Sequence, residues 1–185
     1  MSPAPRRILV TGGAVGIGAA TARALAPDNR LLIHYHRSRG AAESLAESLA
    51  GIAVDVHLAR ADLTTDRGCN ELHEAARTHL GALDVLVNNA GGMIERQSVG
   101  ELTWGHLVDT FALNALSTMR LTSLCRSLLE GGEGACVVNV TSIAVRHGAP
   151  SATAYGAAKA AVDAFTRGAA KELAPICGSS SRRRR

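Results

Sequence analysis

Aromatic residues are scarce in this chain, which has one Trp, two Tyr and two Phe among 185 residues. Proteins that bind single-stranded nucleic acids stack bases on exposed aromatic rings, so this composition does not favour that class. No apolar stretch reaches the roughly 20 residues that a helix needs to cross a bilayer. We therefore expect neither a nucleic acid nor a membrane as partner. No signal peptide opens the chain, which favours the cytoplasm.

The chain also lacks a pattern typical of metal ligands. Its four cysteines show neither CxxC nor metal-ligand spacing. Two of them lie in apolar periodic segments, where a free cysteine behaves as a small buried hydrophobe. The histidines, His34 and His147 among them, show no ligand spacing either. We expect no bound metal and interpret the histidines as structural or surface residues.

The excess of positive charge is confined to the C-terminus. The chain has 20 basic and 16 acidic residues, a formal net charge of +4, and Arg182 to Arg185 supply all of this excess. A terminal arginine run is typical of segments that bind nucleic acid or acidic membranes. Because the rest of the chain is neutral, we do not take this run as evidence for such a partner.

Short apolar runs alternate with longer, Ala-rich amphipathic segments. The predicted strands are residues 7–11, 30–35, 52–58, 83–87 and 135–140. The predicted helices are residues 16–25, 41–50, 64–80, 103–129 and 151–173. Strands without polar alternation are buried on both faces, as in a parallel sheet. The pattern predicts a Rossmann-like α/β fold, in which a doubly wound parallel sheet lies between two helix layers.

Residues 11–18 (TGGAVGIG) follow the first predicted strand and open the first predicted helix. Glycines allow a tight turn and a close approach of backbone amides to a pyrophosphate, and the helix N-terminus adds a favourable dipole. Such turns also serve plain packing, but the position in the first βα unit predicts a dinucleotide site. The candidate contacts are Gly12, Gly16, Ile17 and Gly18.

The end of the second predicted strand has no carboxylate that would bind the adenosine ribose hydroxyls of NAD. The chain there reads His36-Arg37-Ser38-Arg39, and a guanidinium is well suited to bind a phosphate. These residues favour NADP over NAD as the cofactor, with His36, Arg37 and Ser38 as candidate contacts. The alternative is a solvated loop that happens to be basic.

Tyr155 and Lys159 stand four residues apart in a predicted helix, so they lie on one face of it. A neighbouring ammonium favours the phenolate form of a tyrosine, and such a pair can act as a general acid/base near neutral pH. Ser142 lies thirteen residues before Tyr155, after the fifth predicted strand. Taken alone, such a short pattern is more often an ordinary exposed pair, and it gains weight only beside the other motifs.

Together these motifs resemble the short-chain dehydrogenase/reductase family, in its shorter single-domain subgroup, over nearly the whole chain up to Pro175. The motifs, in order, are TGGAVGIG at 11–18, Ala61-Asp62-Leu63, Asn88-Asn89-Ala90-Gly91, Asn114, Ser142, and Tyr155 with Lys159. Each motif is weak alone, but their order and spacing are specific. Residues 34–38 are similar to the NADP-preferring members, which include pteridine reductases and acyl-carrier-protein ketoreductases.

The resemblance implies how the cofactor would be bound. Asp62 would receive the adenine amino group, with the backbone of Leu63 beside it. The segment Asn88 to Gly91 would lie along the adenine ribose and stabilise the central sheet, with Asn89, Ala90 and Gly91 as candidate cofactor contacts. Read by itself, Asp62 could merely cap the following helix, for which Thr64 and Thr65 are also candidate N-caps.

The resemblance also implies catalytic roles. Tyr155 would give or take the substrate proton, and Lys159 would bind the nicotinamide ribose. Ser142 would hydrogen-bond the substrate oxygen, and Asn114 would hold a water that links Lys159 to solvent. Read singly, Ser142 could cap a turn and Asn114 could be an ordinary helix residue. We interpret Trp104 as a packing residue at a helix start.

The chain departs from the family after Pro175. Members normally continue with a sixth strand, a substrate-covering segment and a last strand, whereas residues 176–185 read ICGSSSRRRR. This stretch has no apolar run, so we expect a disordered tail after a dinucleotide-binding domain of residues 1–175. A covering segment excludes water from the site. We therefore expect this truncated chain to be poorly stable and weakly active or inactive.

The predicted function is NADP(H)-dependent interconversion of a carbonyl and an alcohol in a small-molecule substrate, by a homo-oligomer if the C-terminus were complete. The alternatives are a non-catalytic dinucleotide-binding module and an oligomerising subunit. The presence of Ser142, Tyr155 and Lys159 favours the enzyme, because a sensor needs only the glycine turn.

Overall fold

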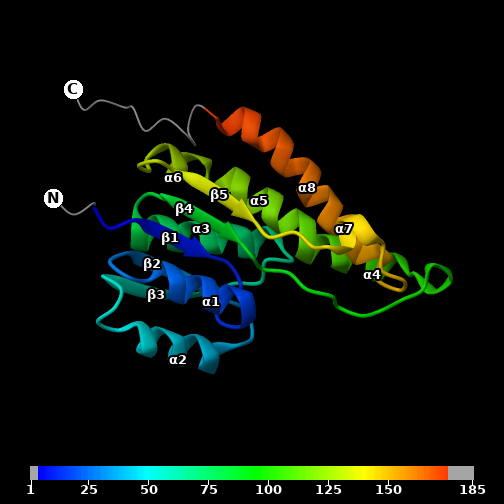
Figure 1. Cartoon of the computed structure of the whole chain (residues 1–185), viewed down its shortest axis with the longest axis horizontal. Coiled ribbons are helices and arrows are strands. Elements are labelled where there is room, and N and C mark those ends of the chain that lie inside the picture. The colour runs from blue at the N-terminus through cyan, green and yellow to red at the C-terminus, as the bar shows by residue number, and fades with distance from the viewer. Residues whose placement is uncertain (1–3, 175–185) are drawn as a thin grey trace.

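The computed structural model describes residues 4–174 and contains a parallel sheet with helices on both faces (Figure 1). The strands are β1 (Arg7–Val10), β2 (Arg30–Tyr35), β3 (Asp55–Arg60), β4 (Val85–Asn88) and β5 (Cys136–Asn139). Their order in the sheet is β3-β2-β1-β4-β5, and every neighbouring pair is parallel. The predicted Rossmann-like α/β fold is confirmed, and the expected tail, 176–185, lies outside the described residues.

The helices form two layers, one on each face of the sheet. They are α1 (Gly16–Leu25), α2 (Arg39–Leu49), α3 (Asp66–Leu80), α4 (Trp104–Phe111), α5 (Ser117–Leu124), α6 (Arg126–Glu130), α7 (Ala144–His147) and α8 (Thr153–Leu173), with the short turns η1 (Val99–Glu101) and η2 (Ala112–Leu116). None of the helices in the described part combines the length and apolar character needed to span a bilayer.

Successive residues of β2 explain the two layers, because side chains alternate between the faces of a sheet. Leu31 and Ile33 are fully buried in a cluster with α1 and α2. Leu32, between them, is fully buried in a second cluster that includes residues of α3 and α5. A strand that must fill both clusters has no room for polar alternation, as the sequence pattern indicated.

Two-sided burial is wrong for the edge strands. β1, β2 and β4 are almost fully buried, but most residues of β3 and β5 are only half-buried, and Val138 of β5 is 48% exposed. Among the described residues, β3 pairs only with β2 and β5 only with β4. The outer side of an edge strand has no neighbour to cover it. β3 also begins and ends later than predicted, at Asp55–Arg60 rather than 52–58.

The predicted helix 103–129 is not continuous. It is divided into α4, the π-helical turn η2, α5 and α6. Trp104, the first residue of α4, is 80% exposed, so its interpretation as a packing residue is wrong. The other long helices agree with prediction to within two residues at each end, and the N-cap of α3 is Thr65. The short elements η1 and α7 were not predicted.

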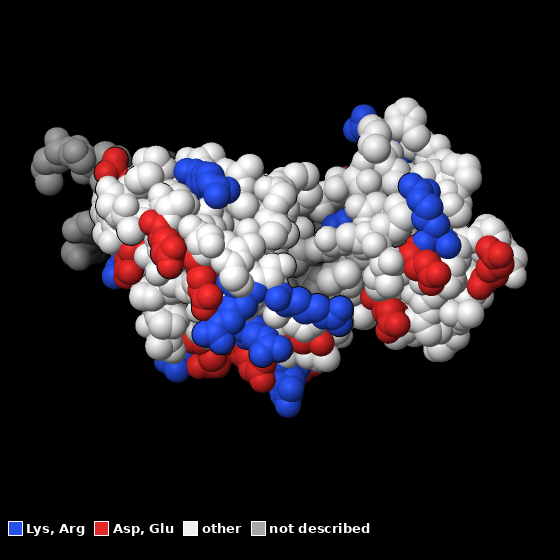
Figure 2. All heavy atoms as spheres, turned by 90° about the horizontal axis from the view of Figure 1, so that it is seen from below, with Lys and Arg blue, Asp and Glu red and all other residues white. Residues whose placement is uncertain are grey.

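The carboxyl ends of β1, β4 and β5 point toward a narrower part of the molecule, which contains α4, α7 and residues 92–101 (Figure 1). Seen from below, a hollow separates the sheet with its helices from this narrower part. Figure 2 also shows basic side chains gathered beside the hollow, with acidic ones next to them. The candidate site residues follow these strand ends.

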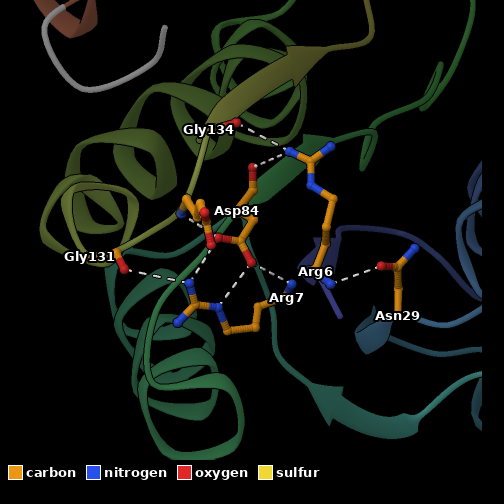
Figure 3. Close-up of polar contacts among 7 residues, drawn as sticks. Arg6, Arg7, Asn29, Asp84, Gly131 and Gly134 are labelled. Atoms are coloured by element: carbon orange, nitrogen blue, oxygen red, sulfur yellow. Dashed lines mark hydrogen bonds and ion pairs between the residues drawn. The ribbon is translucent and has the colours of Figure 1, made fainter. Parts of the chain in front are cut away.

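At the opposite, amino end of the sheet, Asp84 joins three segments (Figure 3). The Arg7 side chain donates to its two carboxylate oxygens at 2.9 and 2.8 Å, and the amides of Arg7 and Glu133 donate to it at 2.7 and 2.6 Å. The Arg6 guanidinium spans the carbonyls of Asp84 and Gly134. Burial opposes ionisation of Asp84, but hydrogen bonds from Arg7 and Glu133 outweigh it and lower its pKa.

We predict that Asp84→Asn lowers the free energy of unfolding by about 3 kcal/mol, because it breaks a charged pair with one buried partner. Urea denaturation followed by circular dichroism measures this loss. The matched control is Asp163→Asn, which removes an exposed pair with Arg167 on α8 and should cost less than about 1 kcal/mol. Equal losses in the two variants would contradict a structural role for Asp84.

The loss of stability caused by Asp84→Asn should depend on pH. The pKa of Asp84 is lowered in the folded state, so its contribution is present above the ordinary carboxyl pKa of about 3.9. That contribution is lost as the pH falls through the folded-state value. The difference in stability between wild type and Asp84→Asn should therefore be full at pH 7 and shrink below about pH 4.

Candidate active site

The glycine turn between β1 and α1 is closely packed on itself. Gly12 has φ +59°, in the left-handed region that favours glycine. A Cβ added to Gly18 would lie 2.2 Å from the carbonyl oxygen of Gly12 and 2.5 Å from the side-chain nitrogen of Asn89. Gly16, at φ +55°, has open space where its Cβ would be. The turn thus presents bare backbone at the start of α1, where amides have no partners inside the helix.

The end of β4 is bonded directly to this turn. The Thr11 hydroxyl accepts hydrogen bonds from the amides of Asn89 and Ala90, both at 2.9 Å. The side-chain amide of Asn89 donates to the carbonyls of Thr11 and Gly12 at 2.9 and 3.1 Å. These four bonds bring the predicted segment 89–91 against the glycine turn. They also show that the side-chain nitrogen of Asn89 already donates its hydrogen bonds within the protein.

Asn88 performs the sheet-stabilising role that was expected of this segment. Its side chain is buried and donates to Thr122 at 3.0 Å and to Asn139 of β5 at 2.8 Å. Asn139 in turn donates to Thr166 of α8 at 2.9 Å. This chain of polar contacts fixes β4, β5, α5 and α8 to one another behind the site.

The ends of β2 and β3 place His36 beside Asp62, with their nearest side-chain atoms 4.0 Å apart. Asp62 accepts from the hydroxyl and amide of Thr64, and the Thr64 hydroxyl is the main cause of its lowered pKa. Arg39 is paired with Glu43 at 2.7 Å, whereas Arg37 is exposed and has no ion pair among residues 4–174. Of these two arginines, Arg37 therefore has its guanidinium free of a carboxylate partner among residues 4–174.

Asn114 is fully buried at the centre of the π-helical turn η2. Its side chain accepts from the amide of Gly92 at 2.8 Å and donates to the carbonyls of Gly92 and Thr110 at 2.9 and 3.0 Å. A Cβ added to Gly91 would lie 2.8 Å from the Asn114 oxygen and 2.9 Å from the Lys159 amine. Asn114, Gly91 and Lys159 are therefore neighbours, as the predicted roles require. π-helical turns occur frequently at functional sites.

Lys159 is an almost fully buried cation, 3% exposed. Its amine donates to the carbonyl oxygen of Val140 at 3.1 Å, just beyond the end of β5. Burial lowers the pKa of Lys159. This contact joins α8 to the strand end that leads, two residues later, to Ser142.

Tyr155 and Ser142 are both half-buried, on α8 and before α7. Tyr155 lies one helical turn before Lys159, so both side chains share a face of α8. The Ser142 hydroxyl accepts from the amide of Ala144 at 3.2 Å, which is the turn-capping contact that was considered as its alternative role. Among the described residues, Ser142 and Tyr155 share no hydrogen bond.

Sequence reasoning missed two residues of this site. Thr11 was considered only as part of the glycine turn, although its hydroxyl joins β1 to β4. His34 is buried and contacts both the turn and the end of β3. A polar residue inside an apolar strand is the only signal for His34. In residues 4–174, no group of three or more His, Cys, Asp or Glu side chains is placed to hold a metal.

The arrangement fits a bound dinucleotide. The turn presents bare backbone at Gly16, where an added Cβ would meet nothing within 4 Å, and it lies at the carboxyl ends of a parallel sheet, where such sheets bind ligands. The family described as short chain dehydrogenase matches residues 6–176. The chain belongs to the short-chain dehydrogenase/reductase family. Other members of the family among the matches are named as dehydrogenases or reductases.

Relatives within the family support the same class. An uncharacterized oxidoreductase of Methylorubrum extorquens is 33% identical over 168 residues, which are 90% of this chain and 66% of that protein. The NADH-dependent reductase A1-R′, solved with NAD, superposes with a TM-score of 0.89 at 29% identity, over 94% of this chain and 74% of that one. A Burkholderia cenocepacia short-chain dehydrogenase, solved with NADP, gives 0.85 at 31% identity, over 92% and 69%. The chain thus spans about two thirds of the length of the Methylorubrum extorquens relative.

We predict that Gly18→Ala destabilises the fold, because its Cβ would overlap backbone atoms of Gly12. The loss should reach about 2 kcal/mol or more, as for overpacked sites in general. The control is Gly40→Ala in α2, where an added Cβ meets nothing within 4 Å and should stabilise the helix by about 1 kcal/mol. Thermal melts of the two variants, read against wild type, measure the difference. Similar shifts in both would contradict the described packing.

Proposed function

We propose that this protein is an NADP(H)-dependent oxidoreductase that interconverts a carbonyl and an alcohol in a small-molecule substrate. One observation carries the proposal: the amine of Lys159 is buried beside Asn114 and Gly91, one helical turn from Tyr155. Burial of a cation costs free energy unless the charge is paired and hydrogen-bonded. Its only direct partner among the described residues is the carbonyl of Val140. Two of its three donors are therefore available for ribose hydroxyls or water.

In the proposed mechanism, Tyr155 gives a proton to the substrate oxygen in reduction, or takes it in oxidation. Lys159 favours the phenolate form of Tyr155 and binds the nicotinamide ribose. Ser142 hydrogen-bonds the substrate oxygen and orients it toward Tyr155. Asn114 holds a water that returns protons to Lys159 from solvent. When bound, the nicotinamide cofactor supplies or accepts the hydride, and the protein orients and polarises the reactants.

The proposed preference for NADP rests on Arg37. It lies at the end of β2, close enough to Asp62 to help lower the pKa of that carboxyl, with Ser38 next to it. A guanidinium binds a phosphate with charge-assisted hydrogen bonds. His36, whose Nε2 lies 4.0 Å from a carboxylate oxygen of Asp62, is a further candidate contact. The structural neighbours include one solved with NAD and one with NADP, so the preference is carried by this chain's own residues.

The alternative of a non-catalytic dinucleotide-binding module requires the turn but not Tyr155 or Lys159. We propose assembly as a property of the enzyme rather than its function, through the apolar side chains of Trp104 and Val108 that α4 exposes. That the protein works in the cytoplasm stays a prediction from the sequence.

We predict that Tyr155→Phe lowers the rate of NADPH-dependent carbonyl reduction by about 10²- to 10⁴-fold, the usual contribution of a general acid. NADPH binding, measured by fluorescence, should change little. The control is Tyr35→Phe, the other tyrosine of the chain, which should leave turnover within about twofold of wild type because it removes no acid that faces the substrate. Binding without any Tyr155-dependent turnover of a carbonyl panel would favour the non-catalytic module.

We predict that Arg37→Ala weakens NADPH binding by about tenfold or more, as expected for a lost charged hydrogen bond, with NADH binding unchanged. Titration calorimetry with both cofactors measures the ratio of their dissociation constants. Arg126→Ala, on α6, removes an exposed arginine paired with Glu130 and serves as the control. A loss of affinity for both cofactors alike would contradict a contact with the 2′-phosphate.

A further inference from the structure

His34 is a buried polar residue in the middle of the sheet, 3% exposed on β2. One ring nitrogen, Nδ1, accepts a hydrogen bond from the amide of Gly12 at 3.0 Å. The other, Nε2, bonds to the carbonyl oxygen of Ala61 at 3.1 Å. The His34 carbonyl also accepts from the amide of Gly13 at 2.9 Å. One residue thus fixes two successive amides of the glycine turn and the end of β3.

The partners determine the protonation state of this ring. The Gly12 amide can only donate, so Nδ1 must carry a lone pair, and the Ala61 carbonyl can only accept, so Nε2 must carry the hydrogen. In a doubly protonated ring, the N–H group at Nδ1 would point at the N–H group of Gly12, and the two would repel each other. His34 therefore works as a neutral bridge with a fixed tautomer.

We propose that His34 is a positioning residue for the dinucleotide: its ring fixes the distance between the pyrophosphate-binding turn and the adenine-binding segment Ala61 to Leu63. This inference rests on the proposed function. Thr11 and Asn89 join the turn to the end of β4. Among the described residues, the side-chain hydrogen bonds that link the turn to Ala61, after β3, are those of the His34 ring. Without the ring, the two halves of the cofactor site lose their direct connection.

The surroundings keep the ring neutral. Burial lowers the pKa of His34 to about 4, and the Ala61 carbonyl opposes this only in part. The charged groups that act on it are His36 of the segment after β2 and Asp62 after β3, whose effects have opposite signs. The bridge is therefore intact through the neutral pH range, and the ring adds a side-chain connection to the backbone bonds of Ala61 with Tyr35 and of Gly13 with His34.

The test uses the whole 185-residue chain and two fragments of the cofactor. Inorganic pyrophosphate represents the part that the glycine turn would bind, whereas adenosine 2′-phosphate contains the adenine and the 2′-phosphate without a pyrophosphate. Three variants separate the two hydrogen bonds of the ring. His34→Leu removes both, His34→Asn keeps an acceptor near the position of Nδ1, and His34→Gln keeps a donor near the position of Nε2. Titration calorimetry gives the dissociation constant of each fragment for each variant.

We expect His34→Leu to weaken NADPH binding by about tenfold or more, the effect of about one to two lost hydrogen bonds. His34→Asn should keep the affinity for inorganic pyrophosphate near wild type while the adenosine 2′-phosphate affinity falls, and His34→Gln should show the reverse. A purely structural role would not produce this opposite pattern, because lost stability affects both fragments alike.

The matched control is Leu129→Ala, which creates a cavity under α6 at the amino end of the sheet, away from the turn and from the Ala61 segment. If it weakens both fragments as much as His34→Leu does at a similar melting temperature, the inference is overturned. Wild-type affinity for both fragments in all three His34 variants would also overturn it, while leaving the proposed function standing. A wild-type chain that binds neither NADPH nor either fragment would overturn the proposed function and the inference together.

Discussion

The hydroxyl group of Thr11 holds the centre of the site together. It accepts from two consecutive amides at the end of β4 and donates to the carbonyl of Val87. Amides just beyond the end of a strand have lost their partners in the sheet, and each must find another acceptor if it is buried. Thr11 supplies that acceptor for two of them. The glycine turn and segment 89–91 are therefore adjacent, and Gly91 is delivered to Asn114 and Lys159.

The two ends of the sheet serve different purposes: the amino end stabilises the fold, and the carboxyl end carries the candidate active site. At the amino end, Asp84 and Arg7 join β1, β4 and the turn before β5 with nearly ideal hydrogen bonds. At the carboxyl end, the buried amine of Lys159 is tolerated at some cost in stability. Strong hydrogen bonding at one end allows a buried polar site at the other. Substitutions at the two ends should therefore act on different properties.

Most of the fold could be predicted from the sequence because hydrophobic periodicity and turn residues agree along the chain. α1 and β2 match their predicted bounds at both ends, since glycines and Pro27 delimit them. The edge strands could not be predicted as such, because an apolar run does not say how many neighbours it has. His34 was undervalued for a related reason, since its partners lie 22 and 27 residues away and no local pattern marks them.

The candidate site was predicted as a set of residues, and the structure adds how they are connected. It brings Asn114, Gly91 and Lys159 together, and it gives Asp62 and Ser142 the local capping contacts that were their alternative roles. Those contacts do not exclude ligand binding, since each carboxylate or hydroxyl oxygen has a further lone pair. The meeting of Tyr155 with Ser142 stays a prediction, because their geometry is completed by substrate and cofactor.

The π-helical turn at Ala112–Leu116 has a consequence for the long helical rod around it. One additional residue in a turn rotates everything before it by about 100° relative to everything after it, since each residue of an α-helix advances by that angle. The stripe that α5 buries against the sheet therefore does not continue along α4. That rotation leaves Trp104 and Val108 exposed to solvent. Deleting one residue within the turn would align the buried face of α4 with that of α5, and Asn114 would no longer point into the site.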